Sequence, residues 1–306
     1  MNFEKLANEY LSFISIKGKP QSIRSINSRI NCYILPYFKK YNIEDITKEI
    51  YLNWQIEIEK KDFSYSYKKS LHFTMVAIFN HANKFYDLNY NIPSRVGNFT
   101  NNYELEKNIN IWSYNEYKKF INLVEESIYK ELFDFMYFTG CRLGECLALT
   151  FNDINTNKIF INKTISKEYI NGKRQITRPK TKKSIRTIHI DNFLKNEINN
   201  LRKYYNKLYG CFQEDYYIFG GIKPLSPTTI ERKKNYYCKI AKVKQIRLHD
   251  FRHSHASLLI ENNIPISEIS NRLGHSNVNT TLSVYIHLIN NDEKRVLTAI
   301  NTLRNT

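Results

Sequence analysis

The stretch Arg247-Leu-His-Asp-Phe-Arg-His-Ser-His-Ala-Ser-Leu-Leu-Ile260 predicts a helix with two chemically useful side chains on one face. His249 and Arg252 stand three residues apart, and side chains at this spacing project from the same side of a helix. The neighbouring His253 and His255 fit ordinary packing or surface positions. A solvated helix face also carries such H-x-x-R pairs, so this spacing alone assigns no function.

The stretch Leu273-Gly-His-Ser-Asn-Val-Asn-Thr-Thr-Leu-Ser-Val-Tyr-Ile-His287 predicts a tight turn followed by a second helix. Gly274 suits the left-handed end of a helix, and His275 follows it on the turn. Asn279 can cap the next helix, which would carry Tyr285 on its second turn. The chain contains 23 Tyr, so a single Tyr is more often a packing residue than a nucleophile. Only the combination of a cation, two imidazoles and a phenol points to chemistry.

A further part of this set lies upstream, in Thr139-Gly-Cys-Arg-Leu-Gly-Glu145, directly after the apolar run 132–138. Arg142 stands on a glycine-flanked turn, where a side chain can leave the core and face a ligand. Together these stretches resemble the tyrosine recombinase family, and phage-type integrases in particular. Members carry an Arg in a T-G-x-R-x-x-E turn, then H-x-x-R, then L-G-H, then the nucleophilic Tyr. All four motifs occur here in that order, and the resemblance covers nearly all 306 residues.

The resemblance implies a site-specific DNA recombinase, or integrase, that integrates or excises a mobile element. Such an enzyme cleaves and rejoins DNA strands through a covalent 3′-phosphotyrosine, so the reaction consumes no ATP. A phosphodiester has two non-bridging oxygens that gain charge in the transition state, and the guanidinium groups of Arg142 and Arg252 can hold them. Tyr285 would attack the phosphorus. Its phenol has a reference pKa of about 10, so it needs a base or nearby positive charge.

The resemblance also implies roles for the other polar residues. His249 would help to transfer the tyrosine proton, and His275 would hydrogen-bond the phosphate. Glu145 would orient the neighbouring turn without reacting itself. The expected catalytic set is Arg142, Lys180, His249, Arg252, His275 and Tyr285, with Glu145 in support.

Lys180 enters this set from the most basic segment of the chain. From Lys158 to Arg186 there are ten basic residues and one acid, Glu168, a composition that a solvated cationic surface would also have. Family members carry a catalytic Lys on a hairpin of this kind, and the P-K-T match places it at Lys180. This Lys would protonate the departing 5′ oxygen. Lys182 and Lys183 remain rivals for the role.

The fold class implied by the resemblance is mainly α, with a small antiparallel β-sheet in the C-terminal domain. The two-domain architecture predicts a helical, SAM-like core-binding domain at 1–98, a linker at 99–111, and a catalytic domain with a C-terminal tail helix at 112–306. Apolar residues at helical spacing support this division, and we expect their aromatic members to pack in a core. The pattern fails between 91 and 111, where Pro93 and Gly97 interrupt it. The stripes are Phe3, Leu6, Tyr10 and Phe13; Ile23, Ile26, Ile30 and Tyr37; Ile50, Trp54 and Ile58; and Leu71, Met75, Ile78, Phe79, Ala82, Phe85 and Tyr86.

The catalytic domain contains the only strand-like segments that the sequence offers. Alternating apolar residues predict three strands, and an Asn-Gly pair predicts a hairpin turn between two of them. The strands are expected at 158–162, 164–170 and 185–190, with the turn at 171–172. Helix starts are predicted at Ser113, which forms a capping box with Glu116, at Asp191 and at Ser226-Pro227.

The composition fits double-stranded DNA as the partner. The chain has 46 Lys and Arg against 29 Asp and Glu, a net charge of +17, which favours nucleic acid or an anionic membrane surface. It has no long uncharged apolar run and no signal peptide, so no membrane role is predicted. Both domains are basic, and we expect both to contact DNA phosphates. Candidate contacts are Lys17, Lys19, Arg24, Arg29, Lys68 and Lys69 in the first domain, and Arg232, Lys233, Lys234, Lys239, Lys242 and Lys244 in the second.

The five Cys are scattered and form no C-x-x-C pair. We expect reduced thiols, which fits the cytoplasm or nucleoid of a bacterium. The implied chemistry needs no metal, and the sequence offers no carboxylate cluster suited to Mg²⁺. We therefore expect neither a metal nor a cofactor.

Strand exchange between duplexes implies a homo-oligomer on DNA, with a tetramer at synapsis and an accessory excision factor as a further candidate partner. The segment Asp292–Leu303 predicts an amphipathic tail helix. It can pack on its own domain or on a neighbouring subunit, and the resemblance favours the neighbour. Many integrases also carry an N-terminal domain that binds distant arm sites. The core-binding pattern begins almost at Met1, so we expect that this chain lacks such a domain.

Two other functional classes are compatible with parts of this pattern. A type IB topoisomerase uses the same phosphotyrosine chemistry but relaxes DNA as a monomer. The compact L-G-H-S turn and the tail helix weigh against it. A non-catalytic DNA-binding regulator would keep the basic surface, but it would not need all six catalytic positions.

Overall fold

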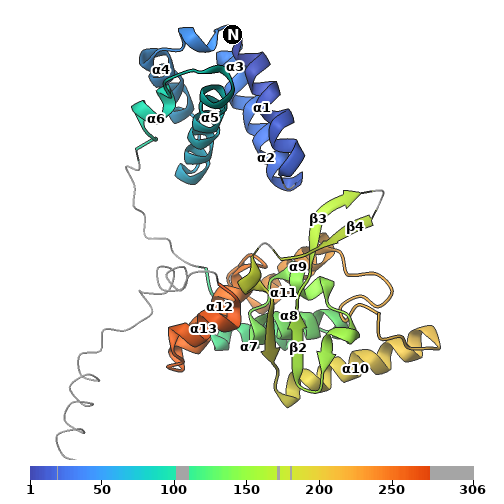
Figure 1. The fold of residues 1–306 in the computed structure, drawn as a ribbon. Coiled ribbons are helices and arrows are strands. Elements are labelled where there is room, and N and C mark those ends of the chain that lie inside the picture. The colour runs from blue at the N-terminus through green and yellow to red at the C-terminus, as the bar shows by residue number, and fades with distance from the viewer. Residues whose placement is uncertain (19, 101–109, 171–172, 180, 276–306) are drawn as a thin grey trace, which may run out of the picture. The chain divides into compact units, whose positions relative to one another are not determined.

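The computed structural model describes residues 1–306 except 19, 101–109, 171–172, 180 and 276–306 (Figure 1). The chain divides into two compact units, Met1–Lys107 and Asn108–Thr306. Each unit has its own buried hydrophobic cluster. None of the helices in the described ranges combines the length and the apolar composition needed to cross a membrane.

The first unit consists of helices packed around aromatic and aliphatic side chains. Asn2, Thr47 and Ser64 cap three of these helices, because each side chain accepts backbone N–H groups of the first turn. Most of the predicted stripes are buried, among them Trp54 and Met75. The elements are α1 (Phe3–Lys17), α2 (Pro20–Arg29), a π-helical turn (Ile30–Ile34), α3 (Leu35–Phe38), a 3-10 turn (Ile43–Asp45), α4 (Lys48–Glu59), α5 (Tyr65–Tyr86) and α6 (Ile92–Val96).

Helix α6 lies where the broken pattern predicted the start of a linker. The Asn91 side chain accepts the N–H of Ser94 at 2.9 Å, and Pro93 occupies the first turn, where its missing N–H is not needed. Farther along, Phe99 is buried and its ring lies 6.1 Å from that of Trp54. The first core therefore extends to Phe99. Pro93, which interrupts the apolar period, lies in the first turn of a helix.

Three aromatic residues predicted to lie in the core are instead exposed. Phe13, Phe85 and Tyr86 keep 44%, 48% and 48% of their surface open to solvent. The rings of Phe13 and Phe85 contact one another and His81 on the outside of α1 and α5. The prediction was wrong because these residues occupy the last turns of their helices, beyond the buried stripe.

The second unit combines helices with two small antiparallel sheets (Figure 1). The predicted starts at Ser113, Asp191 and Ser226 are confirmed, and Ser113 and Glu116 form the expected capping box. The helices are α7 (Tyr114–Ile121), α8 (Ser127–Thr139), α9 (Leu143–Ala148), α10 (Asn192–Tyr209), α11 (Pro227–Ala241), α12 (Asp250–Glu261) and α13 (Ile266–Leu273), with 3-10 turns at Phe151–Asp153 and Lys182–Ser184.

The strands separate into two sheets where the sequence predicted one. A three-stranded sheet has the order β1 (Ile154–Asn155), β2 (Lys158–Ile161) and β5 (Arg186–His189). The second sheet is a hairpin of β3 (Thr164–Ile170) and β4 (Lys173–Thr177), and its turn residues 171–172 lie outside the described residues. This hairpin projects from the body of the unit, and the base of β3 packs on α9 (Figure 1).

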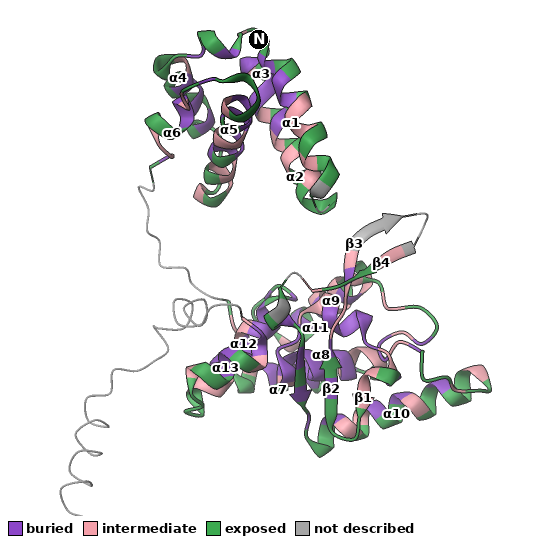
Figure 2. Ribbon diagram, in the orientation of Figure 1, coloured by how far each residue is buried: buried purple, intermediate pink, exposed green. Residues whose placement is uncertain are grey.

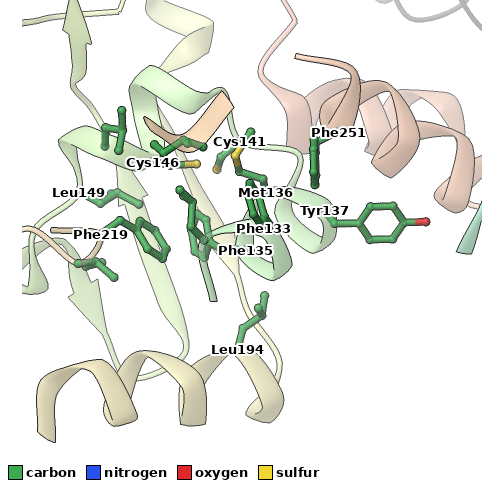
Figure 3. Packing of buried hydrophobic residues seen from close by; sticks show 14 of the residues in the cluster. Phe133, Phe135, Met136, Tyr137, Cys141, Cys146, Leu149, Leu194, Phe219 and Phe251 are labelled. Carbon is green, nitrogen blue, oxygen red and sulfur yellow. The ribbon is translucent and has the colours of Figure 1, made fainter. Parts of the chain in front are cut away.

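Helix α8 lies at the centre of the second core. Buried residues gather on α8 and α9, whereas the outer side of α10 is exposed (Figure 2). Phe133 of α8 stacks on Phe251 of α12, with ring centroids 5.6 Å apart (Figure 3). Burying aromatic surface of this size contributes strongly to folding, and here it joins the helix that precedes the Arg142 turn to the helix that carries Arg252.

Three carboxyl groups lie together between α8 and α10. Glu131 and Asp134 come from α8 and Glu197 from α10, and the hydroxyl of Tyr117 donates a hydrogen bond to Asp134. Burial raises the pKa of Glu131 to about 7. Burial also raises the pKa of Asp134, and burial together with the charge of Asp134 raises that of Glu197. All three carboxyl groups are therefore shifted in the direction of the protonated form.

This cluster predicts a contribution to stability that is lost as the pH rises. The pKa of Glu131 is about 7 when folded against a reference of 4.5, so its contribution is present below pH 4.5 and is lost as pH passes 7. We expect this group to lower the free energy of unfolding by roughly 2 to 3 kcal/mol between about pH 5 and pH 8. In urea unfolding, the Glu131→Gln variant should lack this loss when compared with the wild type at each pH, whereas the exposed Asp215→Asn control should follow the wild type. The same pH dependence in all three proteins would exclude this account.

Candidate active site

The turn that carries Arg142 is fixed by Gly140 and Glu145. Gly140 ends α8 in the left-handed conformation, with φ 67°. A Cβ at this position would stand 2.6 Å from Leu273 and 2.7 Å from His255, so the close approach of α12 and α13 requires glycine. Glu145 then caps the Arg142 backbone N–H at 3.0 Å and pairs with the Arg142 guanidinium at 2.8 Å.

Glu145 is buried, and two arginines share its carboxylate. Its Oε1 pairs with Arg142, while its Oε2 accepts a hydrogen bond of 2.9 Å from Nη2 of Arg186. Burial alone would raise the pKa of Glu145, but the hydrogen bond and charge of Arg186, together with the charge of Arg142, hold it below its ordinary value. The carboxylate therefore stays ionised and orients Arg142 toward the pocket described below.

Arg252 is 2% exposed and bonds to two backbone carbonyls. Its Nη1 donates to the carbonyl of Gly140 at 3.0 Å and its Nη2 to that of Leu273 at 2.6 Å. These bonds fix the guanidinium plane between the turn after α8 and the end of α13. Burial, and then the charges of Arg142 and Arg186, lower its pKa to about 9, so it is still a cation at neutral pH.

His249 and His275 both feel the charge of Arg252, and each lies next to the end of a helix. His249 is the N-cap of α12 and not a residue within it, and its ring lies 5.2 Å from that of His253. His275 follows Gly274, which ends α13 with φ 71° as predicted, and its N–H donates to Ser270 at 3.1 Å. Burial and nearby positive charge lower the pKa of both imidazoles to about 4.

A basic pocket of about 1290 Å³ opens beside Arg142 and His249. Its walls come from α9, α11, strand β4 and the residues that precede α12. The positively charged side chains in these walls greatly outnumber the single acid, Glu231, and such a surface attracts polyanions. They are Arg142, Arg174, Arg232, Lys239 and Arg247.

Helix α11 supplies only part of its predicted cationic face. Arg232 and Lys239 line the pocket, but Lys234 is 1% exposed and donates to the carbonyl of Ile246. Lys233 pairs with Glu126 at 2.6 Å. Successive residues of a helix point in different directions, so Lys234 points inward although Arg232 and Lys233 do not. The prediction that Lys234 faces DNA was wrong. In the first unit, Lys68 pairs with Glu59, and Arg29 donates to the Ser70 carbonyl at 2.8 Å.

Two arginines of the site were missing from the sequence prediction. Arg186 is 9% exposed and lies on the inner face of β5 with Ile188. That inward register was visible in the alternating strand pattern and could have singled out the residue. Arg272 of α13 donates to the carbonyl of Phe138 at 3.1 Å and to Nε2 of His255 at 3.2 Å, so His255 is a buried structural residue.

The structure thus brings five of the expected residues to one region. The charges of Arg142 and Arg252 act on both imidazoles, and Glu145 holds the turn. Lys180 and Tyr285 lie outside the described residues, as do Asn279, His287 and the tail helix. Groups of three or more His, Cys, Asp or Glu that could hold a metal ion are absent from the described part of the chain.

Comparison with known proteins identifies a site-specific tyrosine recombinase. The chain belongs to the phage integrase family: the profile of that family matches residues 112–292, and the profile of the phage integrase N-terminal SAM-like domain matches residues 2–58. The predicted family, fold class and enzyme class are confirmed.

Relatives and solved structures agree with this assignment. The ICEBs1 integrase of Bacillus subtilis (strain 168) is 31% identical over 310 residues, which cover 99% of this chain and 83% of that protein. The Tn1549 transposon integrase, solved with transposon right end DNA, matches with a TM-score of 0.76 at 17% identity, over 93% of this chain and 95% of that one. A lambda integrase tetramer bound to a Holliday junction matches with a TM-score of 0.66 at 16% identity, over 90% and 78%.

The lowered pKa values predict that both site imidazoles are neutral in the free enzyme at about pH 6. His249 and His275 should half-titrate near pH 4, well below the reference of 6.5, because burial, and then the charges of Arg142 and Arg252, disfavour the protonated form. The measurement is a histidine side-chain NMR titration, with His249→Gln and His275→Gln spectra to assign the two signals. Half-titration near 6.5 for either residue would contradict this electrostatic account.

Proposed function

We propose that the pocket around Arg142 binds a DNA phosphodiester, which the second unit cleaves and rejoins through a 3′-phosphotyrosine formed on Tyr285. The observation that carries this proposal is the convergence of two fixed guanidinium groups and two neutral imidazoles beside a basic pocket. Guanidinium groups recognise phosphate oxygens through directional, charge-assisted hydrogen bonds. Held in place before the reaction, they stabilise charge that develops in the transition state.

Arg142 and Arg252 bind the two non-bridging oxygens in this scheme. Glu145 keeps Arg142 in place, and the carbonyls of Gly140 and Leu273 keep Arg252 in place. Because neither arginine has to reorganise when the phosphorus becomes pentacoordinate, their contribution falls on the chemical step.

The proton of Tyr285 leaves as the phenol oxygen attacks the phosphorus. A neutral imidazole can accept a proton, and the lowered pKa of His249 keeps it in that form. His275 is also neutral and can donate a hydrogen bond to the phosphate. The bond to the 5′ oxygen then breaks, Lys180 protonates that oxygen, and the products are a 3′-phosphotyrosine and a 5′-hydroxyl. Attack by a 5′-hydroxyl reverses the step, so the energy of the bond is conserved.

The substrate is double-stranded DNA, bound by both units and recombined by a homotetramer. Arg174, Arg232, Lys239 and Arg247 in the pocket wall supply phosphate contacts, which give affinity without sequence information. The tetramer is proposed because strands pass between two duplexes, and the lambda integrase match is a tetramer on a Holliday junction. The likeness to the ICEBs1 integrase supports integration or excision of a mobile element. A bacterial cytoplasm and an accessory excision factor belong to the same proposal.

The proposal predicts that Tyr285→Phe binds DNA but forms no covalent adduct. Removing one hydroxyl leaves every side chain that is proposed to bind phosphate unchanged, so affinity in a gel-shift assay should change less than about twofold. Incubation with a nicked suicide duplex should trap an adduct only with the wild type, and chelators should not alter its yield. A trapped adduct in the variant, or a phosphopeptide that contains another Tyr, would disprove the assignment.

The same assay separates the two alternative classes. A non-catalytic regulator would bind the duplex and trap no adduct at all. A topoisomerase-like enzyme would trap the adduct and resolve it into relaxed circles, whereas the proposed recombinase exchanges strands between two duplexes.

A second prediction decides which lysine protonates the leaving oxygen. An alkoxide is strongly basic and needs a proton as it departs, whereas a thiolate, with a thiol pKa of about 8.5, leaves unassisted. Lys180→Ala should therefore cleave an ordinary site very slowly and a site with sulfur at the bridging 5′ position at nearly the wild-type rate. Lys182→Ala and Lys183→Ala should lose affinity equally for both substrates and show a shallower salt dependence.

The outcome assigns the role without ambiguity. Rescue by sulfur in Lys182→Ala or Lys183→Ala would move the acid to that residue. If sulfur rescues none of the three variants, a different group, His249 first, protonates the leaving oxygen.

A further inference from the structure

The side chain of Arg186 links three elements of the candidate active site. This side chain is 6% exposed, and it reaches from β5 to the Arg142 turn and to the end of α13. We infer that Arg186 is a positioning residue that sets the relative placement of Arg142, Arg252 and His275. This inference rests on the proposed function, since it concerns how the same site is assembled.

The contacts of Arg186 use all three of its guanidinium nitrogens. Nη2 pairs with Glu145 at 2.9 Å and lies 3.7 Å from the sulfur of Cys141. Nε donates to the carbonyl of Arg272 at 2.8 Å, and Nη1 donates to the carbonyl of Ser184 at 3.1 Å. The planar fork of donors therefore fixes directions on three sides at once, which a single ammonium group cannot do.

Two of these contacts lead to groups that are proposed to bind phosphate. The Glu145 carboxylate that Arg186 holds also binds Arg142. The Arg272 carbonyl that it binds belongs to the residue before Leu273, whose own carbonyl fixes Arg252. His275 then follows after a single glycine. A shift of Arg186 therefore moves both guanidinium groups and one imidazole relative to each other.

The end of α13 packs directly on the strand that carries Arg186. A Cβ at Gly274 would lie 2.9 Å from the carbonyl of Lys183 and 3.0 Å from Cδ of Arg186. This close approach joins the turn before His275 to the segment that follows Lys180. Arg186 thus ties the parts of the site that come from distant stretches of sequence.

The alternative is that Arg186 only stabilises the fold, because the removal of one partner of a buried ion pair is strongly destabilising. The two roles differ in what they change. A residue that only stabilises lowers the free energy of unfolding and leaves the folded fraction fully active. A positioning residue changes the rate of the chemical step in protein that is folded and saturated with DNA, because small misplacements of catalytic groups cost about a hundredfold in rate.

The test compares Arg186→Lys and Arg186→Gln with the wild type on a suicide duplex. At saturating enzyme, the single-turnover rate of adduct formation should fall at least about tenfold in Arg186→Lys and further in Arg186→Gln. DNA affinity should stay within about twofold, since Arg186 is buried beneath the pocket. The matched control is Arg202→Lys, which alters an exposed arginine paired with Glu214 in the same unit and should leave the rate unchanged. Circular dichroism and thermal melts establish the folded fraction of each protein.

A double substitution tests the route through Glu145. If Arg186 acts through Glu145, both substitutions break the same contact, so Arg186→Gln with Glu145→Gln should lose less activity than the product of the two single losses. If Arg186→Gln does not fold, Arg186→Lys alone decides, and folded Arg186→Lys that cleaves at the wild-type rate overturns the inference. A loss that appears only in DNA affinity, with the saturated rate unchanged, overturns it as well. Absence of any adduct with the wild type would instead overturn the proposed function.

Discussion

The ionised carboxylate of Glu145 is the constraint on which the site depends. Arg142, Arg186 and Arg252 crowd around one another, and burying that much positive charge is unfavourable without compensation. A single buried acid and a few backbone carbonyls supply this compensation. The acid pairs with Arg142 and Arg186, and the carbonyls of Gly140 and Leu273 accept from Arg252. The free site therefore remains short of negative charge, which is the condition that favours an incoming phosphate.

Close backbone approach makes this arrangement possible. Gly140 and Gly274 both have positive φ, and a side chain at either would collide with the element packed against it. Gly144 has the same function for the hairpin, because its Cβ would lie 2.6 Å from the Thr164 hydroxyl of β3. Three glycines thus let α8, α9, α13 and the strands meet around the arginines. Packing of Phe133 on Phe251 then holds α8 to α12 from the core side.

The order of motifs predicted the family, the fold class and the enzyme class, because that order can be recognised in the sequence without any knowledge of contacts. Helix starts were predicted well where a local side chain caps the first turn, as at Ser113 and Asp191. Predictions failed where the outcome depends on tertiary packing. Spacing could not reveal that Lys234 is buried or that Phe85 lies beyond the core. Arg186 was missed because a charged residue in a basic segment looks solvated until its partners are known.

The arginines and the histidines of the site differ in their charge at neutral pH. At neutral pH, the arginines keep their charge although burial lowers the pKa of Arg252 to about 9, whereas His249 and His275 give theirs up. Burial, and then neighbouring positive charge, lower all three pKa values, but only the histidines, whose reference pKa of 6.5 is far below that of arginine, fall below neutral pH. A phosphate beside Arg252 opposes that effect and raises all three pKa values. Fixed charge for the phosphate and neutral imidazole for proton transfer thus follow from one electrostatic environment.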